Sequence, residues 1–527
     1  MIPMRMSSRP SLAVGLLGVL ICVFGSTLNA ANADSTLAQR ISQHIAQEKF
    51  AAAVWGVKVV SLKDGRTIFE RHADKLLIPA SNAKLFTAAL ALDRLGTDFR
   101  FRTSLYSSSS ITGSGTLRGD LIVYGRGDPT FAAHFNEGDY RKSLYPVYRA
   151  LKAAGVKRIT GAIIGDESFF RGPSMGYGWT WDDLQEYYGA ETSALTVDDN
   201  TIDVAITPGK RLGEPCRIVV KPTTGLLTFI NGSKTGAPNS PRRIKLHRPV
   251  GQNTVHVNGS LPLGSEARLA AVAIHKPAGL FLELLAQTLE TRKINVSSKR
   301  RTVDWRRRLI EPLDTTRMKE IAFVESRPFP EILNAMMKRS QNLYAQLFLL
   351  QVGEMAVRTG AAGADENDAA FVPTSEAAGL AELAVFLDEA GIPADDVLLQ
   401  EGSGLTRASL IKPSATVALL KHMRGHPAAA QFLAALPIAG VDGTLRNRMK
   451  GTAAEGNLRA KTGTLRYVHT LSGYVDADDG EPLAFSIMLN NFLHPDANAS
   501  ARAELDKIAV MLAESGGEPR MNKKKHE

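Results

Sequence analysis

The segment Pro79-Ala80-Ser81-Asn82-Ala83-Lys84, followed by LFTAALALDRL over residues 85–95, decides the fold of this chain. The residues after Lys84 are rich in Leu and Ala and contain no Gly or Pro, which predicts a buried helix. Pro79 is typical of a chain entering such a helix. Ser81 and Lys84 are three residues apart and so share one helix face. Because backbone N–H groups at a helix start favour a developing negative charge, this pair predicts a nucleophilic serine with a lysine partner.

The same S-x-x-K spacing occurs a second time, at Ser409-Leu410-Ile411-Lys412. Pro413 follows directly, and the residue before a proline is pushed out of helical geometry. We therefore expect Ser409 and Lys412 in a loop that leads into a helix over residues 414–423. This difference in local structure assigns the nucleophile to Ser81.

Two K-T-G motifs divide in the same way. Lys234-Thr235-Gly236 lies in a stretch dense in Gly, Asn, Ser and Pro, which predicts a solvated turn. Lys461-Thr462-Gly463 leads into residues 464–477, whose β-branched and aromatic residues predict a strand, and a turn then connects to a second apolar run at 483–492. A lysine on the edge of this hairpin can face the helix that carries Ser81, so we assign the functional motif to Lys461.

A single S-x-N triplet, Ser340-Gln341-Asn342, lies between two stretches with helical composition, residues 330–339 and 343–352. Taken alone, it predicts a short polar junction between helices. Placed between S-x-x-K and K-T-G, it completes an ordered set that is typical of serine acyl-transferases, which open β-lactams or process D-Ala-D-Ala peptides.

Longer segments around these motifs resemble the penicillin-binding serine D-Ala-D-Ala carboxypeptidases and endopeptidases, in particular their low-molecular-mass class C group. The segments are IPASNAKLFTAAL at 78–90, YGRGDPTF at 124–131, GWTWDDLQEYYGAETSAL at 178–195, KRSQNLYAQ at 338–346, GVDGTL at 440–445 and RAKTGTL at 459–465. The similarity runs from about residue 35 to about residue 515. Two features depart from the family: Glu401 stands where the family usually has Asp, and residues 353–368, rich in Ala and Gly, predict an inserted flexible loop.

The resemblance implies acylation and deacylation at Ser81. Lys84 is expected to be the base, with its pKa lowered by burial and by a second cation at Lys461. Ser340 is expected to relay a proton to the leaving amine, and Asn342 to hold the substrate peptide bond.

The resemblance also implies the substrate contacts. The oxyanion hole is expected at the backbone N–H groups of Ser81 and Thr464. Thr462, Gly463 and Thr464, together with the Lys461 cation, are expected to bind the terminal carboxylate of the substrate. Asp183 is expected to pair with the free ammonium of a diaminopimelate or lysine side chain in the stem peptide. An alternative interpretation is that Asp182 and Asp183 cap a helix starting at Leu184.

The chain has 527 residues, which indicates about three domains. Ser340 follows Ser81 by 259 residues, far more than one compact domain needs. We expect an α/β (α+β) fold: a transpeptidase/β-lactamase-like domain, with an antiparallel sheet flanked by helices, split by two mostly β insert domains. The expected parts are a signal peptide at 1–33, the catalytic domain at 34–96 and 306–527, an insert domain at 97–197 and 273–305, and a nested β insert domain at 198–272.

The N-terminus predicts export. Two arginines precede the apolar run at residues 12–24, and Ala31-Asn32-Ala33 follows as an A-x-A cleavage site. The apolar run is short for a transmembrane helix, although a retained anchor is an alternative. We therefore expect a periplasmic or cell-wall-associated protein. Cleavage would remove Cys22 and leave Cys216 alone, so no internal disulfide is expected.

The composition and charge indicate which classes of cofactor and partner to expect. The sequence has no Cys/His cluster with zinc spacing and no phosphate-binding glycine loop, so we predict no metal and no cofactor. The net charge of +10 includes dispersed basic clusters such as Lys299-Arg300-Arg301 and Arg306-Arg307-Arg308. For an exported protein this charge favours a solvated surface, or association with an anionic wall or membrane, over nucleic acid. The expected partners are peptidoglycan stem peptides, with β-lactams as acylating inhibitors, and the oligomeric state stays open.

Two other functions are compatible with the motifs. A β-lactamase of the same fold would need fast deacylation, normally from a positioned glutamate, and no segment clearly offers one. A non-catalytic wall-binding scaffold would not need the complete set Ser81, Lys84, Ser340, Asn342 and Lys461. The sequence leaves the balance between carboxypeptidase and endopeptidase activity open, because both reactions use one site.

Overall fold

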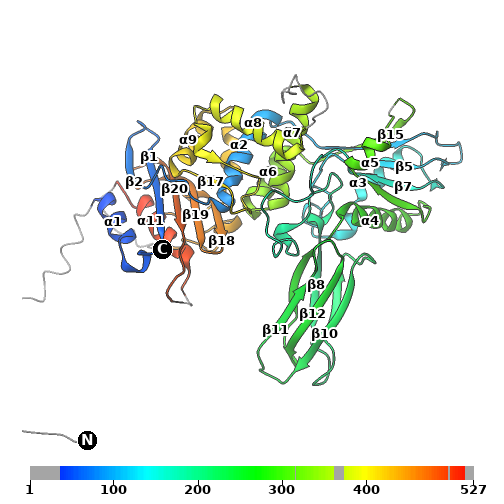
Figure 1. The fold of residues 1–527 in the computed structure, drawn as a ribbon, viewed down its shortest axis with the longest axis horizontal. Helices are drawn as coiled ribbons and strands as arrows, with labels where there is room; N and C mark the ends of the chain where they lie inside the picture. Colours follow the sequence, from blue (N-terminus) through cyan, green and yellow to red (C-terminus); the bar gives the residue numbers. More distant parts are fainter. Residues whose placement is uncertain (1–35, 315, 361–372, 497–498, 517–527) are drawn as a thin grey trace, which may run out of the picture.

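A computed structural model describes residues 36–314, 316–360, 373–496 and 499–516. The expected signal segment 1–33 and part of the expected loop at 353–368 lie outside these residues. Figure 1 shows two bodies side by side: one combines a sheet and helices from both ends of the chain, and the other contains the middle of the chain, with a β unit projecting from it.

The first body is built around an antiparallel sheet of five strands in the order β18-β19-β20-β1-β2. The strands are β1 (Val54–Ser61), β2 (Thr67–Arg71), β18 (Arg459–Leu465), β19 (Val468–Asp476) and β20 (Pro482–Asn490). β1 pairs with β20 along its whole length, with Trp55 opposite Leu489. The two ends of the chain therefore complete one sheet, as the sequence predicts.

Helices cover both faces of this sheet. α1 (Leu37–Ile45) and α11 (Ala501–Ala513) pack on one face in a core that includes Ile41, Leu471 and Ile508. The helices on the other side are α2 (Ala83–Leu95), α6 (Phe329–Arg339), α7 (Asn342–Thr359), α8 (Ser375–Glu389), α9 (Pro413–Gly425) and α10 (Ala429–Ala435). Every residue of α2 from Ala83 to Leu92 is buried, which explains why its sequence is apolar on all sides.

The second body contains a five-stranded sheet in the order β14-β7-β5-β3-β15. Its strands are β3 (Arg102–Ser107), β5 (Leu121–Tyr124), β7 (Ile163–Asp166), β14 (Arg300–Val303) and β15 (Lys319–Glu325). α3 (Tyr145–Ala153) and α4 (Pro277–Thr291) belong to the main core of this body. Val303, Ile164 and Ile122 form a small separate cluster, against which Leu313 and Met318 pack; α5 (Trp305–Ile310) lies between Val303 and Leu313 in the chain.

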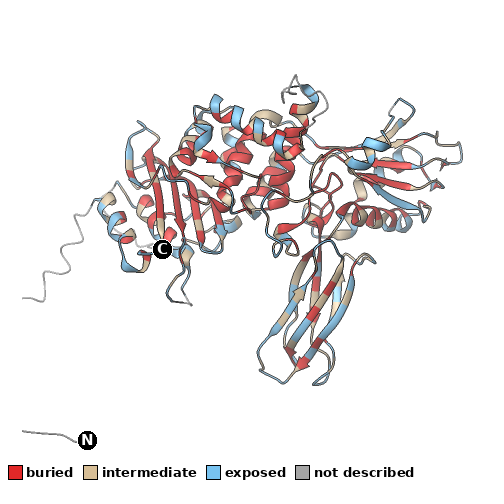
Figure 2. Ribbon diagram, viewed as in Figure 1, coloured by how far each residue is buried: buried red, intermediate tan, exposed pale blue. Residues whose placement is uncertain are grey.

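The projecting unit consists of two three-stranded sheets, in the orders β10-β12-β11 and β13-β8-β9. Its strands are β8 (Thr201–Thr207), β9 (Arg217–Lys221), β10 (Thr228–Gly236), β11 (Arg243–His247), β12 (Thr254–Pro262) and β13 (Arg268–Ala273). Several of these strands alternate between inward and exposed residues, which Figure 2 shows as a mixed colouring against the mainly buried strands of the catalytic sheet. This alternation is typical of sheets with one solvated face.

The remaining elements are short. Two strand pairs are β4 (Thr116–Leu117) with β6 (Arg158–Ile159), and β16 (Val397–Leu398) with β17 (Leu410–Ile411). Several 3₁₀ turns are also present, and two of them, η2 (Ala80–Asn82) and η5 (Tyr187–Gly189), contribute to the site described below. No described helix is both long and apolar enough to cross a bilayer.

Three local expectations were wrong. Lys234 is solvent-exposed as predicted, but it lies in strand β10, paired with β12, and not in a turn. Residues 464–477 do not form one strand: β18 ends at Leu465, and β19 begins at Val468 after a tight turn in which Tyr467 has φ +64°. The expected loop at 353–368 begins as helix, because α7 continues to Thr359.

The sheet pairing bears on one of the domain boundaries expected from the sequence. The boundary expected at 305/306 separates β15 from the insert, yet β15 pairs with β3 at the edge of the insert sheet. We propose that the insert domain extends through β15 and that the second catalytic segment begins with α6, which starts at Phe329.

Candidate active site

Ser81 lies in the 3₁₀ turn η2, directly before α2, as the composition around it predicts. Its side chain is partly exposed, whereas Ala80, Asn82 and Ala83 beside it are buried. The buried Asn82 side chain donates to Ser472 Oγ of β19 at 2.6 Å and fixes the turn against the sheet. The serine hydroxyl is thus the exposed group on a rigidly held turn.

Lys84 is fully buried one turn later, and its Nζ makes three contacts. Nζ lies 3.0 Å from Ser81 Oγ, 2.6 Å from Asn342 Oδ1 and 2.6 Å from the carbonyl oxygen of Ser403. Burial lowers the pKa of Lys84 to about 7, against the opposing effect of the Glu401 carboxylate. A substantial fraction of this lysine is therefore neutral near neutral pH.

The S-x-N triplet forms the junction between α6 and α7. Ser340 ends α6 in the left-handed conformation, with φ +58°, and Gln341 caps α7 by accepting from the Leu343 N–H. Asn342 is the first residue of α7; its Nδ2 donates to the carbonyl oxygen of Tyr188 at 2.8 Å. The polar junction predicted from the sequence is correct, and its geometry turns Ser340 and Asn342 toward the two lysines.

Lys461 is fully buried in the edge strand β18. Its Nζ donates to Ser340 Oγ and to the carbonyl oxygen of Thr462, both at 2.8 Å. Burial, and then the neighbouring charge of Lys84, hold the pKa of Lys461 well below its usual value. The hydrogen bonds of the two lysines thus bring all three motifs together in one site.

The other residues of the K-T-G strand differ in position. Thr462 and Thr464 line the cleft, and Thr462 Oγ1 donates to Thr444 Oγ1 at 2.8 Å. Gly463 is buried and faces the nucleophile turn: a Cβ there would lie 2.1 Å from Thr470 Oγ1 and 2.8 Å from the carbonyl oxygen of Pro79. Gly463, which we expected among the substrate contacts, instead permits the close approach of β18 to the turn that carries Ser81.

Glu401, the position that departs from the family pattern, organises the loop behind Lys84. Its fully buried carboxylate accepts from the N–H and the Oγ of Ser403, at 2.7 and 2.6 Å, and from the Gly404 N–H at 2.6 Å. Because the Ser403 carbonyl is an acceptor for Lys84, Glu401 fixes one of the contacts of the lysine. No motif in the sequence marks this role.

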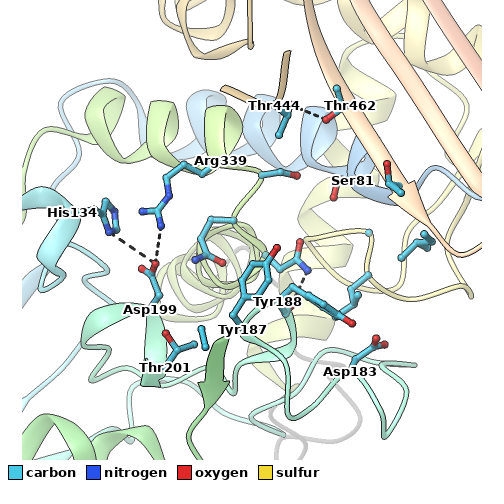
Figure 3. A pocket seen from close by; sticks show the side chains of 18 of the residues that line it. Ser81, His134, Asp183, Tyr187, Tyr188, Asp199, Thr201, Arg339, Thr444 and Thr462 are labelled. Atoms are coloured by element: carbon cyan, nitrogen blue, oxygen red, sulfur yellow. Dashed lines mark hydrogen bonds and ion pairs between the residues drawn. The ribbon is translucent and has the colours of Figure 1, made fainter. Parts of the chain in front are cut away.

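Asp183 lies on the insert side of the cleft (Figure 3). Its Oδ2 accepts from Thr180 Oγ1 at 2.7 Å. The alternative interpretation, that Asp182 and Asp183 cap a helix starting at Leu184, is wrong, because the next helical element is the 3₁₀ turn η5, which begins at Tyr187.

A cleft of about 1000 Å³ runs between the catalytic half and the inserts, with Ser81 and Thr462 on one wall and Tyr187 and Tyr188 on the other (Figure 3). Its charges are divided between the walls. The insert side contributes Asp182, Asp183, Asp198, Asp199 and Asp203, and the catalytic side contributes Arg339, Arg407, Arg448, Arg466 and Arg502.

Two of these arginines lie near the K-T-G strand. His469 of β19 is directly opposite Thr464 of β18, and burial followed by the charges of Arg502 and Arg448 lowers the pKa of His469 to about 4. Arg448 is held by Asp506, with Nη2 2.6 Å from Oδ1, whereas Arg502 forms no ion pair with any described residue. Sequence reasoning missed both arginines because neither belongs to a motif.

The second S-x-x-K does not form a site. Ser409 is buried, where its Oγ accepts from the Gln400 N–H at 3.1 Å, and Lys412 pairs with Asp396. Among the described residues, no group of three or more His, Cys, Asp and Glu side chains is arranged to hold a metal ion. The free Cys216 is buried in the insert core.

Comparisons with known proteins agree on one family. The sequence pattern of the D-Ala-D-Ala carboxypeptidase 3 (S13) family matches residues 37–512. A D-alanyl-D-alanine carboxypeptidase of Actinomadura sp. (strain R39) is 35% identical over 476 residues, which cover 88% of this chain and 82% of that protein. The D-alanyl-D-alanine carboxypeptidase DacB of Haemophilus influenzae is 26% identical over 449 residues, 84% of this chain and 86% of that protein. The crystal structure of penicillin binding protein 4 (dacB) from Haemophilus influenzae matches with a TM-score of 0.74 at 25% identity, over 89% of this chain and 97% of that one.

These similarities confirm the family resemblance, the fold class and the enzyme class that the sequence predicts, a serine-type D-Ala-D-Ala carboxypeptidase. The chain belongs to the D-Ala-D-Ala carboxypeptidase 3 (S13) family.

Proposed function

We propose that this enzyme cleaves D-Ala-D-Ala bonds, and cross-links with the same scissile bond, through an acyl-enzyme at Ser81 with Lys84 as the base. The observation that carries this proposal is the surroundings of Lys84 Nζ. A neutral amine has two hydrogens and one lone pair. The two 2.6 Å contacts, to Asn342 Oδ1 and to the Ser403 carbonyl, use both hydrogens, so the lone pair is directed at Ser81 Oγ 3.0 Å away.

In the acylation step, Lys84 takes the Ser81 proton as Oγ attacks the carbonyl carbon. The oxyanion is stabilised by the backbone N–H groups of Ser81 and Thr464, a role that typically contributes about 10²–10³ in rate per donor. Ser340, held by Lys461 Nζ at 2.8 Å, relays to the departing amine the proton that Lys84 took from Ser81, which leaves Lys84 neutral and Ser340 with its own proton restored. A water molecule then attacks the ester, with Lys84 as the base again, and releases the shortened peptide.

Asn342 has two roles in this proposal. Its Oδ1 holds Lys84, and one Nδ2 hydrogen is used by the Tyr188 carbonyl. The second Nδ2 hydrogen remains to donate to a carbonyl of the substrate, which supports the role expected from the sequence.

The substrate's terminal carboxylate binds beside the K-T-G strand. The hydroxyl-bearing Thr462 and Thr464 line the cleft there, and the positive charges of Arg448 and Arg502 lie on the same side of the cleft. A substrate with a free carboxylate would give Arg502 a negative partner, which favours peptides that end in a free carboxylate.

Asp183 recognises the free ammonium of the stem-peptide side chain in the acyl part of the substrate. The Thr180 hydroxyl orients the Asp183 carboxylate, and Tyr187 and Tyr188 lie beside it on the same wall of the cleft. A charge-assisted pair in this partly exposed position gives selectivity rather than rate.

We expect slow deacylation of a β-lactam, and hence inhibition by it, because of how the carboxylate of Glu401, which influences Lys84, is held. The Glu401 oxygens are occupied by donors from its own loop, including the N–H groups of Ser403 and Gly404. Glu401 is therefore poorly placed to activate a water molecule as the glutamate of a β-lactamase does.

We also propose that the enzyme works outside the inner membrane, after removal of residues 1–33 and in contact with peptidoglycan. The substrate class and the A-x-A motif at 31–33 support this location. N-terminal sequencing of protein recovered from the periplasm should begin at Asp34; recovery only from the cytoplasm, with the N-terminus intact, would contradict it.

The activity is tested by D-Ala release from a peptide that ends in Lys-D-Ala-D-Ala, with and without penicillin. Ser81→Ala is expected to abolish release, whereas Ser409→Ala, in the second S-x-x-K, is expected to keep it. Release that survives in Ser81→Ala, or that is lost only in Ser409→Ala, would overturn the assignment.

A further inference from the structure

Helix α5 has an inverted arrangement of polar and apolar side chains. Leu309 and Ile310 are 73% and 75% exposed, which places them among the most exposed large apolar residues described. Arg308, next to them, points inward and pairs with the buried Asp166, with Nη2 2.6 Å from Oδ2. On the surface of a soluble protein, charged side chains normally face the solvent and large apolar side chains face inward. This helix is therefore a candidate for contact with something outside the protein.

The helix is fixed in this orientation. Besides the Arg308–Asp166 pair, the Trp305 indole N–H donates to the Gly172 carbonyl at 3.0 Å, and the Asp304 carboxylate caps the helix by accepting from the Arg307 N–H at 2.9 Å. Turning Leu309 and Ile310 inward would break all of these contacts and leave Asp166 buried without its partner.

Cations surround the apolar pair. Between Lys299 and Lys319 the sequence has eight lysines and arginines and three carboxylates. Arg306 shares the outer face of α5 with Leu309 and Ile310, at spacings of three and four residues, and its guanidinium lies over the Trp305 ring. Lys299, Arg300 and Arg301 are exposed cations at the sheet edge formed by β14, and Arg301 Nη1 lies 3.8 Å from the carboxylate of Glu311, which follows α5.

Much of this positive charge is not compensated. Arg301 and Arg307 share one carboxylate, that of Glu311. Lys299, Arg300 and Arg306 form no ion pair with any described residue. We refer to Lys299, Arg300, Arg301, Arg306, Arg307, Leu309 and Ile310 as the α5 surface.

We propose that the α5 surface binds the headgroup region of an anionic lipid bilayer. Such a bilayer offers both of the environments this surface needs: anionic headgroups for the cations, and the acyl boundary for two adjacent apolar side chains. A soluble anionic polymer offers only the first. In Figure 1, α5 lies on the insert body, away from the catalytic sheet. Binding there would hold the enzyme at the membrane surface without covering the cleft.

The test is co-sedimentation with phosphatidylglycerol/phosphatidylcholine vesicles and with vesicles of phosphatidylcholine alone. The protein begins at Asp34, because residues 12–24 form an apolar run that would bind vesicles by itself. Every core residue lies at Ile41 or beyond, so this chain keeps the whole described fold. Labelling of each variant with fluorescent penicillin checks that it is folded.

The unmodified chain should bind the anionic vesicles and release them at high salt, where the Debye length falls to about 3 Å. Leu309→Ser/Ile310→Ser should weaken binding by about tenfold or more, because both apolar contacts are lost. Lys299→Gln/Arg300→Gln/Arg306→Gln should weaken it about fivefold for each charge removed. The matched control Leu212→Ser/Leu269→Ser, at residues 66% and 69% exposed in the projecting unit, should bind as the unmodified chain does.

Four results would overturn the proposal. The unmodified chain could fail to bind anionic vesicles, or Leu309→Ser/Ile310→Ser could bind them with unchanged affinity. If a soluble polyanion displaces the unmodified chain and Leu309→Ser/Ile310→Ser from anionic vesicles equally well, the surface would be reassigned to an anionic polymer. A lipid-free dimer in sedimentation velocity that is lost in Leu309→Ser/Ile310→Ser would reassign it to a second copy of the chain.

Discussion

Lys461 Nζ donates a 2.8 Å hydrogen bond to Ser340 Oγ and so ties the edge strand β18 to the α6–α7 junction, 121 residues earlier in the chain. This bond joins the second and third motifs, as the Lys84–Asn342 bond joins the first and second. Ser340 is therefore held by the buried Lys461 side chain, and we expect the leaving amine to receive its proton there.

Ser340→Gly separates the chemistry of this residue from its conformation. The substitution removes the hydroxyl while suiting the φ of +58°, so the free energy of unfolding should stay unchanged or rise by up to about 1 kcal/mol. The acylation rate should fall by about 10²–10⁴. Ser340→Ala should lose the same activity but be less stable than Ser340→Gly. Thermal unfolding and stopped-flow acylation measure the two effects, and a Ser340→Gly enzyme with full activity would exclude the proton relay.

The pKa of Lys84 predicts how acylation depends on pH. Only the neutral amine can accept the Ser81 proton, and the pKa of this buried lysine is about 7. The value of kcat/KM for penicillin acylation should therefore rise as pH increases toward 7 and level off above it. A rate that is flat down to acidic pH, or that rises only near pH 10, would contradict a base with this pKa. Circular dichroism at each pH checks that the protein stays folded.

Gly463→Ala tests the close approach of β18 to the nucleophile turn. The new Cβ would lie 2.1 Å from Thr470 Oγ1 and 2.8 Å from the Pro79 carbonyl oxygen. Overpacking of this kind typically costs about 1–3 kcal/mol, and here it should also displace Ser81 and slow acylation. Gly425→Ala is the control, because no neighbouring atom lies within 4 Å of its Cβ. Chemical denaturation and penicillin labelling measure the stability and the acylation of both variants. Equal results for Gly463→Ala and Gly425→Ala would show that the tight contact has no functional role.

Asp183→Asn tests substrate selectivity. The amide oxygen can still accept from Thr180, but the negative charge is lost. For peptides with a free lysine side chain, kcat/KM should fall about 10–100-fold, the usual range for a charge-assisted contact. For the same peptide with an acetylated side chain, kcat/KM should not change. Asp182→Asn is the neighbouring control, and an equal loss on both peptides would assign Asp183 to the cleft's structure and not to recognition.

The strongest local patterns were predicted from the sequence. α9 (Pro413–Gly425) contains the helix predicted over residues 414–423, and the first turn of α2 carries Lys84 as expected. Both helices have continuous helix-forming residues, so local propensity and tertiary packing favour the same structure.

Elements that depend on distant pairing were harder to predict. Turn-forming residues around Lys234 indicate a loop, yet β10 becomes a strand because β12 pairs with it, and the pairing outweighs the local preference. The turn between β18 and β19 contains no Gly or Asn, so the sequence shows one continuous strand there.

Dependence on contacts between distant parts of the chain also explains which site residues were not predicted from the sequence. Ser81, Lys84, Ser340, Asn342 and Lys461 are visible because each belongs to a short motif. Arg448 and Arg502 line the cleft and Glu401 lies behind Lys84, and only the folded chain brings these residues together from separate elements. The domain boundary near β15 depends in the same way on a partner, β3, more than 200 residues away.

The most direct test of the central claim is mass spectrometry of the protein after incubation with benzylpenicillin, followed by proteolysis. The account predicts one penicilloyl adduct on the peptide that contains Ser81, persisting after the free drug is removed and absent from Ser81→Ala. An adduct on another serine, an adduct that disappears as fast as it forms, or no adduct on folded protein would contradict an acyl-enzyme at Ser81.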